Sequence, residues 1–282
     1  MSRVFEVQID GGPYALAAGP DGGMWVTLVH AGAIARVGVD GAVDLHHVDA
    51  EAKPSLITAG PDGAMWFTRA GDDRIGRIAT DGGLSSYELP SGSDPFGITV
   101  GPDGALWFTA MTSGVIGRIS VDGEVSQEAA PGGMPSMITT GPDGALWFTL
   151  NKANAIGRLE PTGGMTLRRL TTPNAGPVGI ASTHDDTVWF TEILAERLGR
   201  IPMTDAIQEL DMPGKPHAVA ADPDGGVWVS LWGADQLARV SADGEVDTID
   251  LPAGSEPHGL AFAPDGALWV ALESGFVLRF PT

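Results

Sequence analysis

The segment GPDGALWFT (Gly101–Thr109) decides the fold, because it recurs with small changes along the whole chain. Its tryptophan is one of seven spaced at intervals of 41, 41, 40, 42, 39 and 41 residues: Trp25, Trp66, Trp107, Trp147, Trp189, Trp228 and Trp269. Six of them close a P-D-G-(A/G)-(L/M/V)-W segment, whereas the fifth copy reads H-D-D-T-V-W at 184–189. A repeat of about 40 residues with short strands between Asp-Gly turns is typical of β-propeller blades. The sequence therefore predicts an all-β, seven-bladed β-propeller.

Each repeat contains four short segments with strand character, separated by turn residues. In the copy that spans 94–136 we expect strands at 95–100, 105–109, 115–119 and 124–130. The Pro-Asp-Gly turn between the first two combines a fixed φ with a residue that tolerates positive φ, and an Asp-Gly pair separates the last two. The pattern predicts four-stranded blades whose first strand lies nearest the axis of the ring.

The two ends of the chain complement each other. The chain ends at GFVLRF (Gly275–Phe280), which matches the third strand of a blade, so the last blade lacks its outer strand. The chain begins with VFEVQI (Val4–Ile9), which matches the missing strand. We therefore expect the N-terminal strand to pair with the last blade, which closes the ring and covers a sheet edge. On this interpretation residues 1–282 form a single domain.

Composition argues against several classes of function. With 16 basic and 36 acidic residues among 282, the chain has a net charge of −20, which argues against nucleic-acid phosphates as partners and favours a soluble protein kept apart by self-repulsion. No apolar run approaches the roughly 20 residues that a membrane span requires. The first ten residues include Glu6 and Asp10 and no apolar stretch, and cysteine is absent. We therefore expect a monomeric, cytoplasmic protein with no nucleic-acid or membrane partner.

The seven copies carry different residues at the start of the innermost strand. Each blade has the pattern X-Pro-Z there, where X and Z are the residues before and after the proline. Position Z, which lies near one mouth of the central channel in a propeller, is held by Tyr14, Ser55, Phe96, Ser136, Val178, His217 and His258. Ring closure makes the last two blades and the first blade consecutive. Tyr14, His217 and His258 therefore occupy the same position on three neighbours, and the sequence predicts that they converge on one sector of the mouth.

Two carboxylates belong to the same sector. Glu256 precedes the inner-strand proline of the last blade, and Glu273 lies four residues past Trp269, in a loop at the same mouth. Two acids within reach of one ion suit a hard cation such as Mg²⁺, and a histidine beside them can move protons near neutral pH. Taken singly, a tyrosine, histidine or acid at a channel rim is more often a solvated or hydrogen-bonded filler. The placement of all five residues on adjacent blades favours a functional cluster.

Other polar residues offer less. Four histidines in loops or on an outer strand are expected to have no role in function: His30, His46, His47 and His184. Arg69 and Lys53 face the same mouth, where they either hold a substrate carboxylate or, as is more common, form a solvated rim. Glu192 is interpreted as a structural or rim residue.

Several motifs resemble the virginiamycin B lyase family across the whole chain: GPDGALWFT repeated with IGRI, KPHAV (Lys215–Val219), EPHGL (Glu256–Leu260) and ALES (Ala271–Ser274). That family consists of seven-bladed propellers that act on streptogramin B antibiotics. The resemblance implies a Mg²⁺-dependent lyase, and hence antibiotic resistance. Such an enzyme linearises a small cyclic depsipeptide without water, by removing the α-proton of a threonine whose β-oxygen leaves as a carboxylate.

The resemblance also implies roles for the five residues at the mouth. Glu256, the acid of E-P-H, and Glu273 would bind Mg²⁺. His258 would be the general base or acid, while His217 and Tyr14 would position the substrate and its leaving group. Together these residues make a small cyclic peptide the expected partner.

Two other functions remain open. A metal-dependent lactonase-type hydrolase would share the architecture, but such propellers usually line the funnel with Asp, Asn and Glu on several blades. Here ligand-type residues concentrate on one side, opposite Ser136 and Val178, which disfavours hydrolysis. A propeller that binds a ligand without catalysis is the second alternative.

Overall fold

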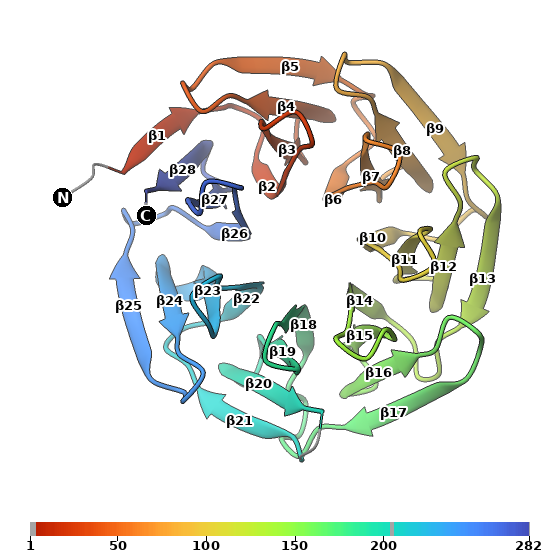
Figure 1. The fold of residues 1–282 in the computed structure, drawn as a ribbon, viewed down its shortest axis with the longest axis vertical. Coiled ribbons are helices and arrows are strands. Elements are labelled where there is room, and N and C mark those ends of the chain that lie inside the picture. The colour runs from red at the N-terminus through yellow and green to blue at the C-terminus, as the bar shows by residue number, and fades with distance from the viewer. Residues whose placement is uncertain (1–3, 204–205, 282) are drawn as a thin grey trace.

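The computed structural model describes residues 4–203 and 206–281. Within them the chain forms seven four-stranded antiparallel sheets arranged as blades around a central axis (Figure 1). The seven-bladed propeller predicted from the tryptophan repeat is therefore confirmed.

The strands fall into four concentric sets. The innermost strands, which all begin at a proline, are β2 (Pro13–Ala18), β6 (Pro54–Ala59), β10 (Pro95–Val100), β14 (Pro135–Thr140), β18 (Pro177–Thr183), β22 (Pro216–Ala221) and β26 (Pro257–Phe262). The second strands carry the repeated tryptophans: β3 (Met24–Leu28), β7 (Met65–Arg69), β11 (Leu106–Ala110), β15 (Leu146–Leu150), β19 (Thr187–Glu192), β23 (Val227–Leu231) and β27 (Leu268–Leu272).

The third strands are β4 (Ala33–Val37), β8 (Arg74–Ile78), β12 (Val115–Ile119), β16 (Ala155–Leu159), β20 (Arg197–Pro202), β24 (Gln236–Val240) and β28 (Phe276–Phe280). The outer strands are β5 (Val43–His47), β9 (Leu84–Glu88), β13 (Val125–Ala129), β17 (Met165–Arg169), β21 (Gln208–Asp211), β25 (Val246–Asp250) and β1 (Phe5–Gln8). A short 3₁₀ helix, η1 (Trp232–Ala234), follows β23. The second strands are buried along nearly their whole length, whereas most residues of the outer strands are exposed or half-buried.

The ring closes as the sequence predicts. Strand β1 pairs antiparallel with β28, with Phe5 opposite Arg279 and Gln8 opposite Phe276 (Figure 1). The backbone N–H of Ile9 extends the pairing by donating to the carbonyl of Gly275 at 2.9 Å. The chain's first strand thus completes its last blade, and the exposed edge of β28 is covered.

In the first four blades a carboxylate in the turn before the tryptophan ties the second strand to the third. In the blade of Trp66, the indole Nε1 donates to Oδ1 of Asp62 at 2.9 Å, and Nε of Arg77 donates to Oδ2 at 2.6 Å. Partial burial raises the pKa of Asp62, but the hydrogen bonds from Trp66 and Arg77 outweigh it and hold the pKa below its ordinary value. The same tryptophan–aspartate–arginine clamp occurs around Trp25, Trp107 and Trp147.

This clamp requires a glycine at the start of the turn. A Cβ added to Gly60 would lie 2.3 Å from Cδ1 of Trp66, and the equivalent glycines of the other three clamped blades show the same conflict. In the last three blades the position carries Thr183, Asp222 and Ala263 instead. The indole N–H groups of Trp189 and Trp269 have no hydrogen-bond partner among the described residues, and that of Trp228 turns to Asp222 itself at 3.0 Å. The departure at H-D-D-T-V-W is therefore one of three changes in the clamp.

No helix in residues 4–203 and 206–281 has the length and apolar character needed to cross a membrane.

We predict that Gly60→Ala destabilises the protein by about 1–3 kcal/mol, because the new methyl group must displace the buried indole of Trp66 from Asp62. Urea unfolding measures the loss. Gly83→Ala is the matched control in the same blade, since its Cβ would lie 3.2 Å from Oδ1 of Asp81 and 3.8 Å from Cβ of Ala79, without the close conflict seen at Gly60. Equal stability of the two variants would contradict the steric role of Gly60.

Candidate active site

Two loops of every blade meet at one mouth of the channel, and a backbone hydrogen bond joins them. In all seven blades the residue four positions past the repeated tryptophan donates its N–H to the residue before the inner-strand proline: Val29 to Gly12, Ala70 to Lys53, Met111 to Asp94, Asn151 to Met134, Ile193 to Gly176, Trp232 to Lys215 and Glu273 to Glu256. The last of these bonds, 3.1 Å long, holds the backbones of the two candidate metal ligands side by side.

His258 and Glu273 form the centre of the polar cluster. His258 is only 6% exposed, and its Nε2 lies 2.5 Å from Oε2 of Glu273. The carboxylate lies off the N–H direction, so this contact is an electrostatic pair rather than an aligned hydrogen bond. The other oxygen of Glu273, Oε1, lies 2.8 Å from Nε2 of His30, in the loop that follows β3. Glu273 therefore bridges histidines from two neighbouring blades.

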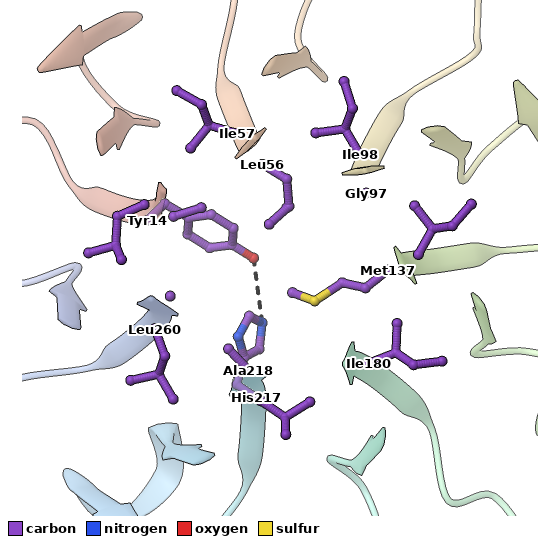
Figure 2. A pocket seen from close by; sticks show the side chains of 15 residues that line it. Tyr14, Leu56, Ile57, Gly97, Ile98, Met137, Ile180, His217, Ala218 and Leu260 are labelled. Carbon is purple, nitrogen blue, oxygen red and sulfur yellow. Dashed lines mark hydrogen bonds between the residues drawn. The ribbon is translucent and has the colours of Figure 1, made fainter. Parts of the chain in front are cut away.

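His217 and Tyr14 continue the cluster toward the axis. Nδ1 of His217 lies 3.4 Å from Nδ1 of His258, and the two rings are nearly perpendicular at 89°. The hydroxyl of Tyr14 lies 3.5 Å from Nε2 of His217, and Figure 2 shows these two side chains pointing toward each other across the channel. Glu273, His258, His217 and Tyr14 thus form one connected row.

The row has a consistent set of proton positions. With a proton on Nε2 of His258, facing the carboxylate of Glu273, Nδ1 of His258 accepts from Nδ1–H of His217. Nε2 of His217 then accepts from the hydroxyl of Tyr14. The negative charge of Glu273 favours the His258 tautomer with its proton on Nε2, which leaves the lone pair of His258 on Nδ1.

Close approach of the inner strands sets the backbone of the row. Thr191 donates its hydroxyl to the carbonyl of His217 at 2.8 Å, across the seam between two blades. A Cβ on Gly179 would lie 2.4 Å from that same carbonyl, and a Cβ on Gly259 would lie 2.8 Å from the carbonyl oxygen of Tyr14. Glycine at these two positions therefore lets adjacent blades meet closely enough for the side chains to touch.

Burial shifts the titration of the row in different directions. Burial, with the neighbouring His258, lowers the pKa of His217 to about 3. Burial also lowers the pKa of His258, but the negative charges of Glu273 and Glu256 oppose that lowering. Burial, reinforced by the charge of Glu273, raises the pKa of Tyr14 above its ordinary value. At neutral pH Tyr14 and His217 are uncharged, and His258 is the histidine whose protonation the carboxylates favour.

Below the row the channel is apolar. Tyr14 and His217 line a cavity of about 140 Å³ together with inner-strand aliphatic residues such as Leu56, Ile98 and Met137 (Figure 2). Met137 reaches into this space from the far side of the ring. The connected row of polar side chains thus lies in one sector of the mouth, next to the apolar side chains that line the channel.

Glu256 stands apart from the row. It is exposed, and its backbone adopts a φ of 50°, in the left-handed region. In the described part of the chain no three His, Cys, Asp or Glu side chains form a ready-made metal cage. Mg²⁺ commonly keeps several waters and takes only one or two carboxylates from the protein, with substrate oxygens completing its shell. Glu256 and Glu273, on adjoining backbones, fit such a partial site.

The structure brings together four of the five residues singled out in the sequence, and it places Glu256 next to them through its backbone. It also adds His30, for which no function was expected. The only sequence signal for His30 is its place in the mouth loop, directly after Val29. His46 is structural, since its ring stacks on Trp25 with centroids 5.6 Å apart.

The rim interpretation was wrong for Arg69, whereas for Glu192 the structural alternative is confirmed. Arg69 is not a solvated rim residue, because it is 8% exposed and its Nε donates to Oδ1 of Asp72 at 3.0 Å. Glu192 is not at the rim either: it is fully buried, and neither carboxylate oxygen has a hydrogen-bond partner among the described residues. Burial raises the pKa of Glu192 to about 7, with Glu209 adding to the rise and Arg197 opposing it.

Comparisons with known proteins show one family across the whole chain. The model of the virginiamycin B lyase family matches residues 2–280. The virginiamycin B lyase of Mycolicibacterium smegmatis is 72% identical over 281 residues, covering 100% of both chains. The crystal structure of the Staphylococcus aureus virginiamycin B lyase superposes with a TM-score of 0.93 at 35% identity, covering 98% of each chain. A catalytically inactive histidine-to-alanine variant of that enzyme, solved with quinupristin, has the same TM-score, identity and coverage.

We predict that Glu192→Leu stabilises the protein above neutral pH. The equivalent residue is leucine in four other blades: Leu28, Leu150, Leu231 and Leu272. Because the pKa of Glu192 rises from 4.5 to about 7 on folding, the folded state holds its proton more tightly. The stability that this proton provides is therefore full below pH 4.5 and is lost as pH rises through 7.

Urea unfolding between pH 5 and 8 tests this prediction. The free energy of unfolding of the parent should fall by roughly 2–3 kcal/mol across this pH range, and Glu192→Leu should not show that fall. Glu128→Leu, at an exposed position, should show the same dependence on pH as the parent. A slope that persists in Glu192→Leu would show that another group titrates.

Proposed function

The chain belongs to the virginiamycin B lyase family, and we propose that it is a Mg²⁺-dependent carbon–oxygen lyase that linearises streptogramin B antibiotics by elimination at the ring ester. The observation that carries the proposal is the row of Glu273, His258, His217 and Tyr14 on three adjacent blades. An elimination requires a base beside an acidic C–H bond and a hydrogen-bond donor for the departing oxygen. This sector of the mouth supplies both groups.

His258 is the better base of the two buried histidines. The carboxylate of Glu273, 2.5 Å from its Nε2, stabilises the positive charge that the imidazole gains when it takes the threonine α-proton. His217 has no such partner to offset its burial and remains neutral. The α-proton moves to Nδ1 of His258, where the substrate replaces the long contact with His217, and the C–H electrons form the α,β double bond. The Cβ–O bond breaks, and its oxygen leaves as a carboxylate, so no water is consumed.

Tyr14 serves as a donor rather than a base. Its raised pKa keeps the phenol protonated at neutral pH, so its O–H can turn from the long contact with His217 and donate to the carboxylate that develops on the leaving group. His217, between Tyr14 and His258, keeps both side chains in place through contacts at 3.5 and 3.4 Å.

Glu256 and Glu273 are the residues that would hold Mg²⁺. When bound there, the ion would stabilise negative charge on a substrate carbonyl oxygen. The exposed position of Glu256 leaves room for water and substrate oxygens as further ligands. Glu273 contacts both His258 and His30, which holds its carboxylate at the edge of the row.

The rest of the mouth suits a largely apolar ring-shaped substrate. The mouth and channel positions of the blades opposite the row carry half-buried apolar residues: Phe96, Met111, Met134, Met137, Val178 and Ile193. Quinupristin, which was bound to an inactive histidine variant of the S. aureus enzyme, supports a streptogramin B as the ligand for this surface. Burial of these side chains against apolar groups of the substrate favours binding, while the polar sector acts on the ester.

Incubation of the purified protein with a streptogramin B, with and without EDTA, tests the function. Elimination produces a chromatographically distinct, linear product of unchanged mass, and EDTA should prevent it. A mass increase of one water would indicate a lactonase-type hydrolase instead. Recovery of the intact ring after binding would indicate a propeller that binds without catalysis.

We predict that His258→Ala abolishes turnover while substrate binding, measured by calorimetry, stays near that of the parent, because only proton transfer is lost. His217→Ala should retain more activity, since a positioning role is shared with Tyr14 and the backbone. If His217→Ala is dead while His258→Ala turns over, the two roles are reversed.

We predict that Glu256→Gln and Glu273→Gln each weaken Mg²⁺ binding and remove most activity, because a neutral amide lacks the charge that a hard cation requires. Calorimetric titration with Mg²⁺ and activity at limiting Mg²⁺ measure the two effects, while thermal unfolding should change little. Full activity of either variant at limiting Mg²⁺ would remove that residue from the metal site.

A further inference from the structure

We infer that Asp235 is a positioning residue that fixes the segment carrying Glu256 and His258, an inference that rests on the proposed function of those two residues. Asp235 follows η1 on the neighbouring blade and contacts neither the histidines nor Glu273 through any of its hydrogen bonds. Its carboxylate instead reaches across the seam between blades. Oδ2 accepts from the N–H of Gly254 at 2.7 Å, and Oδ1 accepts from the N–H of Glu256 at 2.9 Å.

The backbone of Glu256 has a φ of 50°, which places a non-glycine residue in the left-handed region immediately before Pro257. Lys53 and Met134 adopt the same conformation before their prolines without a carboxylate at the position of Asp235, so the blade itself sets this φ. Asp235 adds two hydrogen bonds that hold the segment of Glu256 more firmly in this conformation. Two charge-assisted hydrogen bonds from one carboxylate are strong enough to do so.

The segment is also held from its other side. Its carbonyl at Glu256 accepts from the N–H of Glu273, and the hydroxyl of Ser274 donates to the carbonyl of Ser255 at 3.0 Å. These bonds come from the last blade, whereas those of Asp235 come from the blade before it. The segment is therefore clamped between two blades, and the direction of the Glu256 side chain, and of His258 two residues later, follows from that clamp.

The chain contains an internal copy of this device without catalytic residues. Asp73 has a φ of 53°, close to the 51° of Asp235, and its carboxylate accepts from the N–H of Gly92 at 2.7 Å and of Asp94 at 2.8 Å. Asp94 adopts a φ of 53° before Pro95, as Glu256 does before Pro257. The geometry is the same, but the segment leads to Phe96 rather than to a histidine.

A third copy shows what an amide can do at this position. Asn154 accepts from the N–H of Ala175 through Oδ1 at 2.7 Å, and its Nδ2 donates to the carbonyl of Thr172 at 2.8 Å. An asparagine therefore holds one N–H of the following segment instead of two. Asp235→Asn is for this reason a conservative variant that should retain part of the function.

The experiment compares Asp235→Ala with Asp73→Ala. Each variant should speed hydrogen exchange at its own pair of amides, Gly254 and Glu256 or Gly92 and Asp94, and both should lose similar stability. Only Asp235→Ala should lower kcat/KM, by about 10–100-fold as is typical when a residue supporting a metal ligand is removed. Asp235→Asn should fall between Asp235→Ala and the parent. Calorimetric Mg²⁺ affinity should weaken in Asp235→Ala alone.

Three outcomes would overturn the inference. The first is parental kcat/KM in Asp235→Ala despite rapid exchange at Glu256. The second is an equal loss of kcat/KM in Asp73→Ala, which would show a general effect of destabilisation. The third concerns the case in which the parent leaves the antibiotic intact and the proposed function fails. In that case a Mg²⁺ titration of Asp235→Ala that matches that of the parent would refute the inference.

Discussion

The clamp between tryptophan, aspartate and arginine is the interaction on which the regular part of this propeller depends. One carboxylate, such as Asp62, holds the indole of the second strand and the guanidinium of the third. Because the aspartate lies in the turn between the first two strands, the clamp locks three strands of a blade at the end far from the mouth. The loops at the mouth take no part in this clamp, so they can carry different residues in different blades.

Ring closure then determines which of those residues meet. Tyr14 and His258 lie on the first and last blades, and they touch only because β1 completes the sheet of β28 and draws the two blades together. The same seam is packed by Val7, Ile9, Leu16 and Trp269 in one hydrophobic cluster. Gly259 allows the inner strands at this seam to approach within contact of the Tyr14 carbonyl. The closure of the fold and the assembly of the candidate site are thus the same event.

The sequence predicted features that repeat or that sit at equivalent positions. The spacing of the tryptophans is enough for the blade number, and comparison at position Z is enough to bring Tyr14, His217 and His258 together. It did not predict contacts that depend on the reach and burial of individual side chains. His30 contacts Glu273 through the reach of its side chain, which residue type and phase alone do not show. The burial of Arg69 and Glu192 is an exception, since both align with four leucines of other blades and that alignment marks an interior position.

The candidate site works through an imbalance between two similar histidines. Both are buried, and burial alone would leave each of them a poor base at neutral pH, because the interior disfavours the imidazolium. Glu273 breaks the symmetry by lying against only one of them. That carboxylate in turn lies between His258 and His30, so its own position depends on two blades. The backbone of Glu256 is held by Asp235 from a third. The base strength of His258 therefore depends on residues of three neighbouring blades, which explains why Glu273, His258, His217 and Tyr14 lie together in one sector of the mouth.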